Sequence, residues 1–180
     1  MPFARTWSEE LVAEWLQLEG FLAEVGVPIM SASGGGRREA DVIGARIHES
    51  ILEIQHVEVG ALPGGPEHDI ETIRKKFSPE NEKAIEAYCR KKFGFKEEDV
   101  RVEKCYVATY ASKKTQAKAI PEAIGGSSFV MLDDFVRDKV VPAIRKWKEK
   151  PPHETKIKGH YLVLPDGMWL LQVLDRFYQR

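Results

Sequence analysis

Two neighbouring apolar runs, separated by only three residues, constrain the fold of this chain most strongly. The run EADVIGARI spans residues 39–47, and ILEIQHVEV spans residues 51–59. Both are rich in β-branched residues, which favour strands. The connecting His-Glu-Ser is of hairpin length. The sequence therefore predicts an antiparallel strand pair, yet both strands carry acidic groups among residues that a sheet should bury.

The remaining elements are predicted from their periodicity and their end signals. Thr6 and Glu9 have capping-box spacing, so a helix is expected to begin there. Apolar residues at helical intervals then continue to a stop at Gly26; they are Leu11, Trp15, Leu18, Leu22 and Val25. Further strands are expected at 27–30, 100–110, 127–132 and 160–164, and further helices at 68–77, 79–93, 113–124, 133–150 and after Gly167.

This order of elements predicts an α/β fold with a central mixed sheet flanked by helices. The length of 180 residues suits a single domain. We expect that domain to cover residues 1–180, with its core at about 8–132 and a C-terminal extension at about 133–180. Pro142 is expected to kink or restart the helix at 133–150.

The charge balance and the cysteines narrow the class of protein. Lys and Arg number 27 against 28 Asp and Glu, a formal net charge of -1. Any attraction to phosphate must therefore come from local patches. Cys89 and Cys105 are too few for a disulfide framework or a zinc site, which predicts reduced thiols and a cytoplasmic protein. No apolar run reaches the ~20 residues that span a bilayer, so no membrane partner is expected.

The acidic residues of the strand pair suggest a metal site. Successive side chains of a strand point to opposite faces, so Glu53 and Gln55 share one face of their strand. A hairpin that aligns this face with the face of Asp41 would bring Asp41 and Glu53 together. Adjacent carboxylates repel each other, and a divalent cation relieves the repulsion. Mg²⁺ (or Mn²⁺) bound by Asp41 and Glu53 is the resulting expectation.

Asp41 in ADVIGA and the triplet Glu53-Ile54-Gln55 resemble the motif of the PD-(D/E)xK nuclease superfamily. The predicted order of helix, three-strand meander, helix and strand is similar to the same core, and most similar to archaeal Holliday-junction resolvases. The resemblance covers roughly residues 8–110. It implies a restriction-endonuclease-like αβββαβ core and Mg²⁺-dependent hydrolysis of phosphodiester bonds in DNA, with Gln55 positioning the water.

One position departs from the superfamily pattern. Gln55 stands where the superfamily usually has lysine, and an amide can position water but supplies no positive charge. Lys104, Lys113 or Lys114 could provide that charge instead. The alternative is a catalytically degenerate nuclease fold that binds nucleic acid or a protein partner. A third possibility is an α/β scaffold unrelated to nucleases, which predicts that the carboxylates of Asp41 and Glu53 point apart.

The resemblance also implies an acidic residue from the first helix. Glu14 is expected to fill this role because it lies beside the apolar face of that helix, and Glu10, one turn earlier, is the alternative. Glu9 is assigned to the helix cap. His56 falls on the strand face opposite Glu53 and is expected to be a core histidine.

Two basic pairs are candidates for contact with DNA. Arg37 and Arg38 follow a Gly-rich turn, and Lys113 and Lys114 begin another basic stretch. Each pair could equally be solvated surface. The last helix is rich in Trp, Leu and Phe, so it either packs on the sheet of its own domain or forms a homodimer interface.

Overall fold

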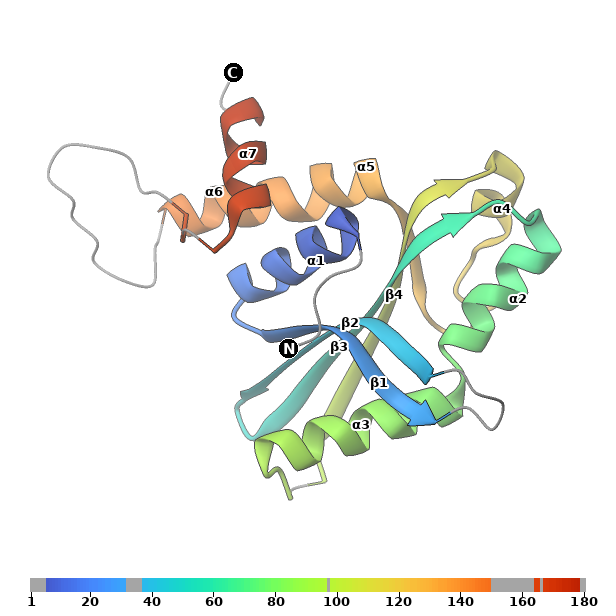
Figure 1. The fold of residues 1–180 in the computed structure, drawn as a ribbon, viewed down its shortest axis with the longest axis horizontal. Coiled ribbons are helices and arrows are strands. Elements are labelled where there is room, and N and C mark those ends of the chain that lie inside the picture. The colour runs from blue at the N-terminus through green and yellow to red at the C-terminus, as the bar shows by residue number, and fades with distance from the viewer. Residues whose placement is uncertain (1–5, 32–36, 97, 150–163, 166, 179–180) are drawn as a thin grey trace, which may run out of the picture.

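The computed structural model describes residues 6–31, 37–96, 98–149, 164–165 and 167–178 of the chain. Within these residues a five-stranded mixed sheet is flanked by helices, and the predicted α/β class is confirmed (Figure 1). Helices that could span a lipid bilayer, judged by length and apolar character, are absent from this part of the chain.

The strands lie in the sheet in the order in which they occur in the chain. They are β1 (Leu22–Ser31), β2 (Arg37–His48), β3 (Ile51–Leu62), β4 (Val100–Ala111) and β5 (Ser128–Met131). β1, β2 and β3 form an antiparallel meander, whereas β4 is parallel to β3 and β5 is parallel to β4. Parallel neighbours need a long crossover. Two helices provide it between β3 and β4, namely α2 (Pro66–Lys76) and α3 (Pro79–Phe93).

The helices form layers on both faces of the sheet. The others are α1 (Trp7–Leu18), α4 (Lys113–Lys118), α5 (Leu132–Phe135), η1 (Val136–Val140), α6 (Val141–Glu149) and α7 (Trp169–Tyr178). Figure 1 shows α1 with α5, α6 and α7 on one face and α3 on the other. Val42 and Val57 face the α1 side, whereas Ile43 and Ile54 pack toward α3. The two strands thus contribute alternate residues to two separate cores.

The first helix is shorter than its apolar pattern predicts. The predicted start is confirmed, because the Thr6 side chain accepts a hydrogen bond from the Glu9 N–H. The helix ends at Leu18, however, and Gly20 adopts the left-handed φ of 86° that reverses the chain. The prediction that the helix continues to Gly26 was wrong: Leu22 already belongs to β1.

The turn between β2 and β3 contains two residues rather than three. Glu49 and Ser50 have positive φ values of 49° and 65°, the conformation of a type I′ turn. His48 pairs directly with Ile51, and Val42 consequently pairs with Val57. A three-residue loop would shift the pairing by one residue, so each β2 side chain would share a face with the other set of β3 side chains. That shift decides which acidic residues meet.

The helix predicted at 133–150 passes Pro142 through a π-helical turn. Proline has no N–H to donate, and its ring crowds the carbonyl four residues earlier. The preceding segment widens at η1, where the Val141 N–H bonds to the Val136 carbonyl. This wider turn sets Asp138 and Lys139 on an exposed side while Val140 and Val141 stay buried.

The remaining predicted elements are found with altered limits. The helix expected at 113–124 is helical only over α4, and the strand expected at 27–30 is part of the longer β1. Of the strand expected at 160–164, only Leu164 is among the described residues, and it is not in a strand. No observation tests the division into a core and an extension.

Candidate functional site

Two acidic residues meet across the β2–β3 pair, but they are Asp41 and Glu58. Because Val42 pairs with Val57, the next positions, Asp41 and Glu58, oppose each other on the face toward α2 and α3. Asp41 Oδ2 also accepts a hydrogen bond of 2.9 Å from the Val59 N–H. This bond between neighbouring strands fixes the Asp41 carboxyl group beside the Glu58 side chain.

A lysine from α2 completes this cluster. Lys76 is the last residue of α2, and its ammonium group lies 3.6 Å from Asp41 Oδ1 and forms an ion pair with Glu58 Oε2. The Glu58 side chain is 1% exposed, whereas those of Asp41 and Lys76 are 24% and 37% exposed. The cluster therefore has a buried anchor and an open side where Asp41 and Lys76 can reach a ligand.

The cluster carries more negative than positive charge when both carboxyl groups are ionised. Burial and the nearby Glu58 raise the pKa of Asp41 to about 6, and burial raises the pKa of Glu58 as well. The charges of Glu58 and Asp41 raise the pKa of Lys76 against the effect of its burial, so it stays protonated. One ammonium group thus faces two carboxyl groups.

The buried His56 ring forms a hydrogen bond with the Glu58 carboxyl group. His56 is fully buried, as expected for a core histidine, and its Nε2 lies 2.7 Å from Glu58 Oε1. Burial and the Lys76 charge lower the pKa of His56 to about 4, so the ring is neutral near pH 7. When Glu58 is ionised its carboxylate can only accept, and His56 Nε2–H is then the donor. Phe77 packs edge-on against the ring, with centroids 4.9 Å apart.

The structure separates the predicted pair Asp41 and Glu53, and the expectation that they share a metal ion is wrong. Glu53 opposes Arg46 on the α1 face, and the two form an ion pair of 2.6 Å. Gln55 lies on the same face and donates to Glu103 Oε2 at 2.7 Å. Neither side chain can act on a group bound by Asp41, because the sheet lies between them.

Glu14 has a structural partner instead of a place beside Asp41. Its carboxylate accepts hydrogen bonds from the N–H groups of Leu170 and Leu171, at 3.2 and 2.9 Å, in the first turn of α7. The side chain is buried on the α1 side of the sheet, away from the Asp41 face. The predicted catalytic contribution of Glu14 is therefore not supported by its position. Glu10, the alternative, is on the same helix.

The other predicted basic residues remain partly untested. Lys104 lies on the α3 face, but it bonds to Glu82 at 3.0 Å and to the Gly125 carbonyl at 3.2 Å. Lys113 and Lys114 are exposed in the first turn of α4. Arg37 and Arg38 begin β2, and their side chains lie outside the described parts of the structure.

The sequence reasoning missed Glu58 and Lys76. Glu58 lies five residues after Glu53 in the same apolar run, so counting with a two-residue turn would have placed it opposite Asp41. Lys76 had a weaker signal, as part of a basic run that could contact DNA if it faced the carboxylates. It ends a helix in the run Arg-Lys-Lys, where cations are common for reasons of the helix dipole alone.

No cluster of three or more His, Cys, Asp or Glu side chains able to hold a metal ion occurs within the described ranges. The Asp41–Glu58 pair offers two carboxyl groups, and Mg²⁺ commonly uses one or two carboxylates with water and substrate phosphate. No protein-family model matches the chain, and no curated protein matches it.

Proposed function

We propose that the chain is a Mg²⁺- or Mn²⁺-dependent nuclease of the PD-(D/E)xK type, with Asp41, Glu58 and Lys76 at its centre. The observation that carries the proposal is the convergence of these three side chains from β2, β3 and α2. Two carboxyl groups and one ammonium group are the functional groups that the superfamily pattern requires. DNA is the expected substrate, and the restriction-endonuclease-like core is part of the proposal.

The raised pKa of Asp41 and the surplus of carboxyl groups favour a divalent cation at this position. A bound cation would relieve the repulsion between Asp41 and Glu58 and supply charge stabilisation at the scissile phosphate. Asp41, held by the Val59 N–H, and Glu58, held by His56, would be the protein ligands. Lys76 is exposed enough to orient the attacking water or to contact a phosphate oxygen.

The lysine of the proposed centre comes from α2 rather than from β3. In the superfamily pattern the lysine lies two residues after the glutamate. Counted from Glu58, that position is Gly60. A Cβ at Gly60 would lie 3.2 Å from the Tyr106 hydroxyl, so that hydroxyl would have to move by a few tenths of an ångström. Lys76 approaches the same carboxylate from α2 and needs no space on the strand. Gln55, assigned as the substitute by sequence, is not required.

Cleavage assays with matched variants test the proposal. Linear and branched DNA should be cut with Mg²⁺, and Asp41→Asn, Glu58→Gln and Lys76→Met should each lower the rate roughly a hundredfold or more. Glu53→Gln is the control and should cut at the parental rate. Cleavage retained in Asp41→Asn, or lost in Glu53→Gln, contradicts the assignment.

Titration calorimetry with Mn²⁺ separates the nuclease from the degenerate alternative. The parental protein should bind the ion, and Asp41→Asn should weaken the binding strongly. A parental protein that binds neither Mn²⁺ nor Mg²⁺ contradicts a metal-dependent centre and supports a binding role for the fold.

A further inference from the structure

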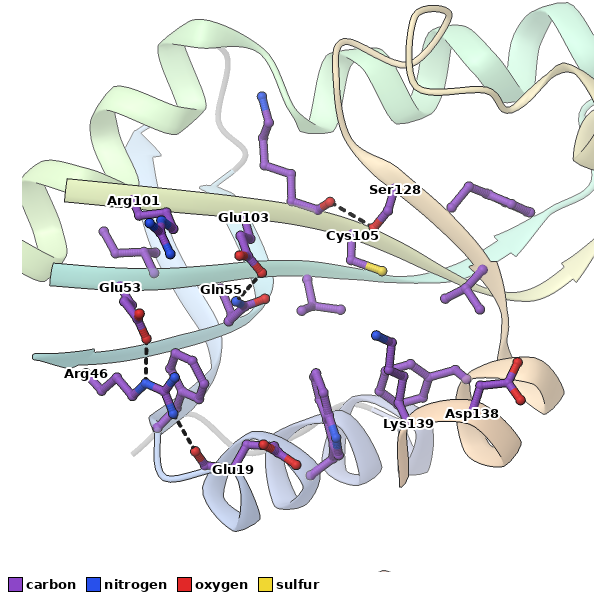
Figure 2. Close-up of a pocket in the computed structure, with 18 residues that line it drawn as sticks. Glu19, Arg46, Glu53, Gln55, Arg101, Glu103, Cys105, Ser128, Asp138 and Lys139 are labelled. Carbon is purple, nitrogen blue, oxygen red and sulfur yellow. Dashed lines mark hydrogen bonds and ion pairs between the residues drawn. The ribbon is translucent and has the colours of Figure 1, made fainter. Parts of the chain in front are cut away.

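The face of the sheet opposite Asp41 holds a separate cavity, shown in Figure 2. It lies between the exposed surface of β3 and β4, the helix α1 and the segment that contains η1. Its volume is about 640 Å³, within the range that organic ligands occupy in proteins. Glu53 and Gln55, which the sequence assigned to a metal site, instead line this cavity.

The rim of this cavity is already ordered by internal contacts. The Arg46 guanidinium donates to Glu53 and to the Glu19 carbonyl, at 2.6 and 2.7 Å, and stacks over the Phe21 ring at 4.1 Å. On the strand surface, Gln55 donates its amide N–H to Glu103 at 2.7 Å. This bond leaves the Gln55 amide oxygen and the second Glu103 oxygen as acceptors for a ligand.

One wall of the cavity is apolar and aromatic. Trp15 of α1 and Phe135 of α5 pack edge to face, with centroids 5.0 Å apart and an interplanar angle of 80°. Val57 of β3 also lines the cavity. Phe135 is buried and holds Trp15 in place, and Trp15 is partly exposed, so its ring offers a flat apolar surface to a ligand in the cavity.

A cation from the π-helical turn points into the same space. Figure 2 shows the Lys139 side chain extending toward Cys105 and the strand floor. The neighbouring Asp138 carboxylate is bound by both arms of Arg137, at 2.8 and 2.9 Å. Of the residues that the structure describes, none forms a hydrogen bond or an ion pair with the Lys139 ammonium group. π-Helical turns occur frequently at functional sites.

We propose that this cavity binds a small, planar organic anion whose ring carries hydrogen-bond donors, the chemistry of a nucleoside monophosphate. Lys139 would receive the anionic group, the Trp15–Phe135 wall would cover the ring, and the acceptors of Gln55 and Glu103 would bind its donors. The site does not depend on the nuclease proposal, since it uses the other face of the sheet and none of the residues Asp41, Glu58 and Lys76.

Nuclear magnetic resonance with adenosine monophosphate as the probe tests this site. Saturable shifts are expected at the backbone amides of Gln55 and Cys105. Adenosine alone and inorganic phosphate alone should bind roughly tenfold more weakly or worse, because each engages only part of the cavity. Lys139→Gln, an exposed substitution, should weaken the monophosphate roughly tenfold and leave adenosine unchanged.

A matched control separates this inference from the proposed nuclease function. Asp41→Asn should bind adenosine monophosphate like the parental protein, although it is expected to lose cleavage. The inference is overturned if the monophosphate produces no saturable shifts at Gln55 and Cys105, or if Lys139→Gln binds it as tightly as the parental protein does.

Discussion

At the scale of single residues, the Asp41 carboxyl group costs the folded chain stability when it ionises. Its pKa in the folded protein is about 6, against an ordinary value of 3.8. As the pH rises from about 4 to about 6, Asp41 loses its proton in the unfolded chain but largely keeps it in the folded chain. The free energy of unfolding should therefore fall over this range, by about 2 kcal/mol if the shift is fully expressed.

Asp41→Asn should remove this contribution while keeping an oxygen for the Val59 N–H. Without divalent ions, the variant should gain stability relative to the parental protein between pH 4 and pH 7, by about 2 kcal/mol. Urea unfolding at the two pH values, with a chelator present, measures the difference. A difference that does not change with pH would show that Asp41 ionises normally in the folded state.

The candidate site could be predicted only in part, because one residue of loop length determines which acids meet. Asp41 was expected from the sequence and lies in the cluster, and the metal centre expected there stays a prediction. A three-residue link would put Asp41 on the face of Glu53, whereas the observed two-residue turn puts it opposite Glu58. Glu-Ser is a poor sequence signal for a type I′ turn, which usually has Asn-Gly.

That turn supports a prediction at the scale of the hairpin. Glu49 and Ser50 both adopt positive φ, which Asn and Gly tolerate better than other residues do. The double substitution Glu49→Asn and Ser50→Gly should stabilise the protein by about 0.5–1 kcal/mol. Thermal unfolding monitored by circular dichroism measures it. Destabilisation would mean that the Glu49 or Ser50 side chain contributes more than backbone strain costs.

Glu14 links two elements that lie far apart in the sequence. Its carboxylate accepts from the first turn of α7, where N–H groups have no partner within the helix. Glu14→Ala would leave these buried donors unpaired, at a cost of about 1–3 kcal/mol. Faster hydrogen exchange at the Leu170 and Leu171 amides than in the parental protein is the expected readout, and Glu14→Gln should restore part of the protection.

Most helices and strands are predictable because their sequence signals are local. The errors occur where contacts with residues distant in the sequence determine the secondary structure. The cap at Thr6 acts within one turn of helix and is found as predicted. Leu22 and Val25 fit a helical pattern, but pairing with Ala45 and Val42 places them in β1. The periodicity of so short a segment does not show whether helix formation or strand pairing is more stable.

For the whole molecule, the homodimer suggested by the sequence stays a prediction. The last helix packs on α1 as expected for an internal contact, through Leu171, yet Trp169 and Phe177 are 53% and 73% exposed. If these residues form an interface between two copies, the parental protein should sediment as a dimer and Phe177→Glu as a monomer. A parental protein that sediments as a monomer at high concentration contradicts the prediction.

Alternate residues of β3 face two different sites, one on each side of the sheet. The strand's even-numbered polar residues, His56 and Glu58, serve the acidic cluster, and the odd-numbered Glu53 and Gln55 line the opposite cavity. Gaining or losing a single amino acid inside this strand would exchange both sets at once, so that neither surface keeps its partners. Related chains should accordingly confine differences in length to the segments outside β3.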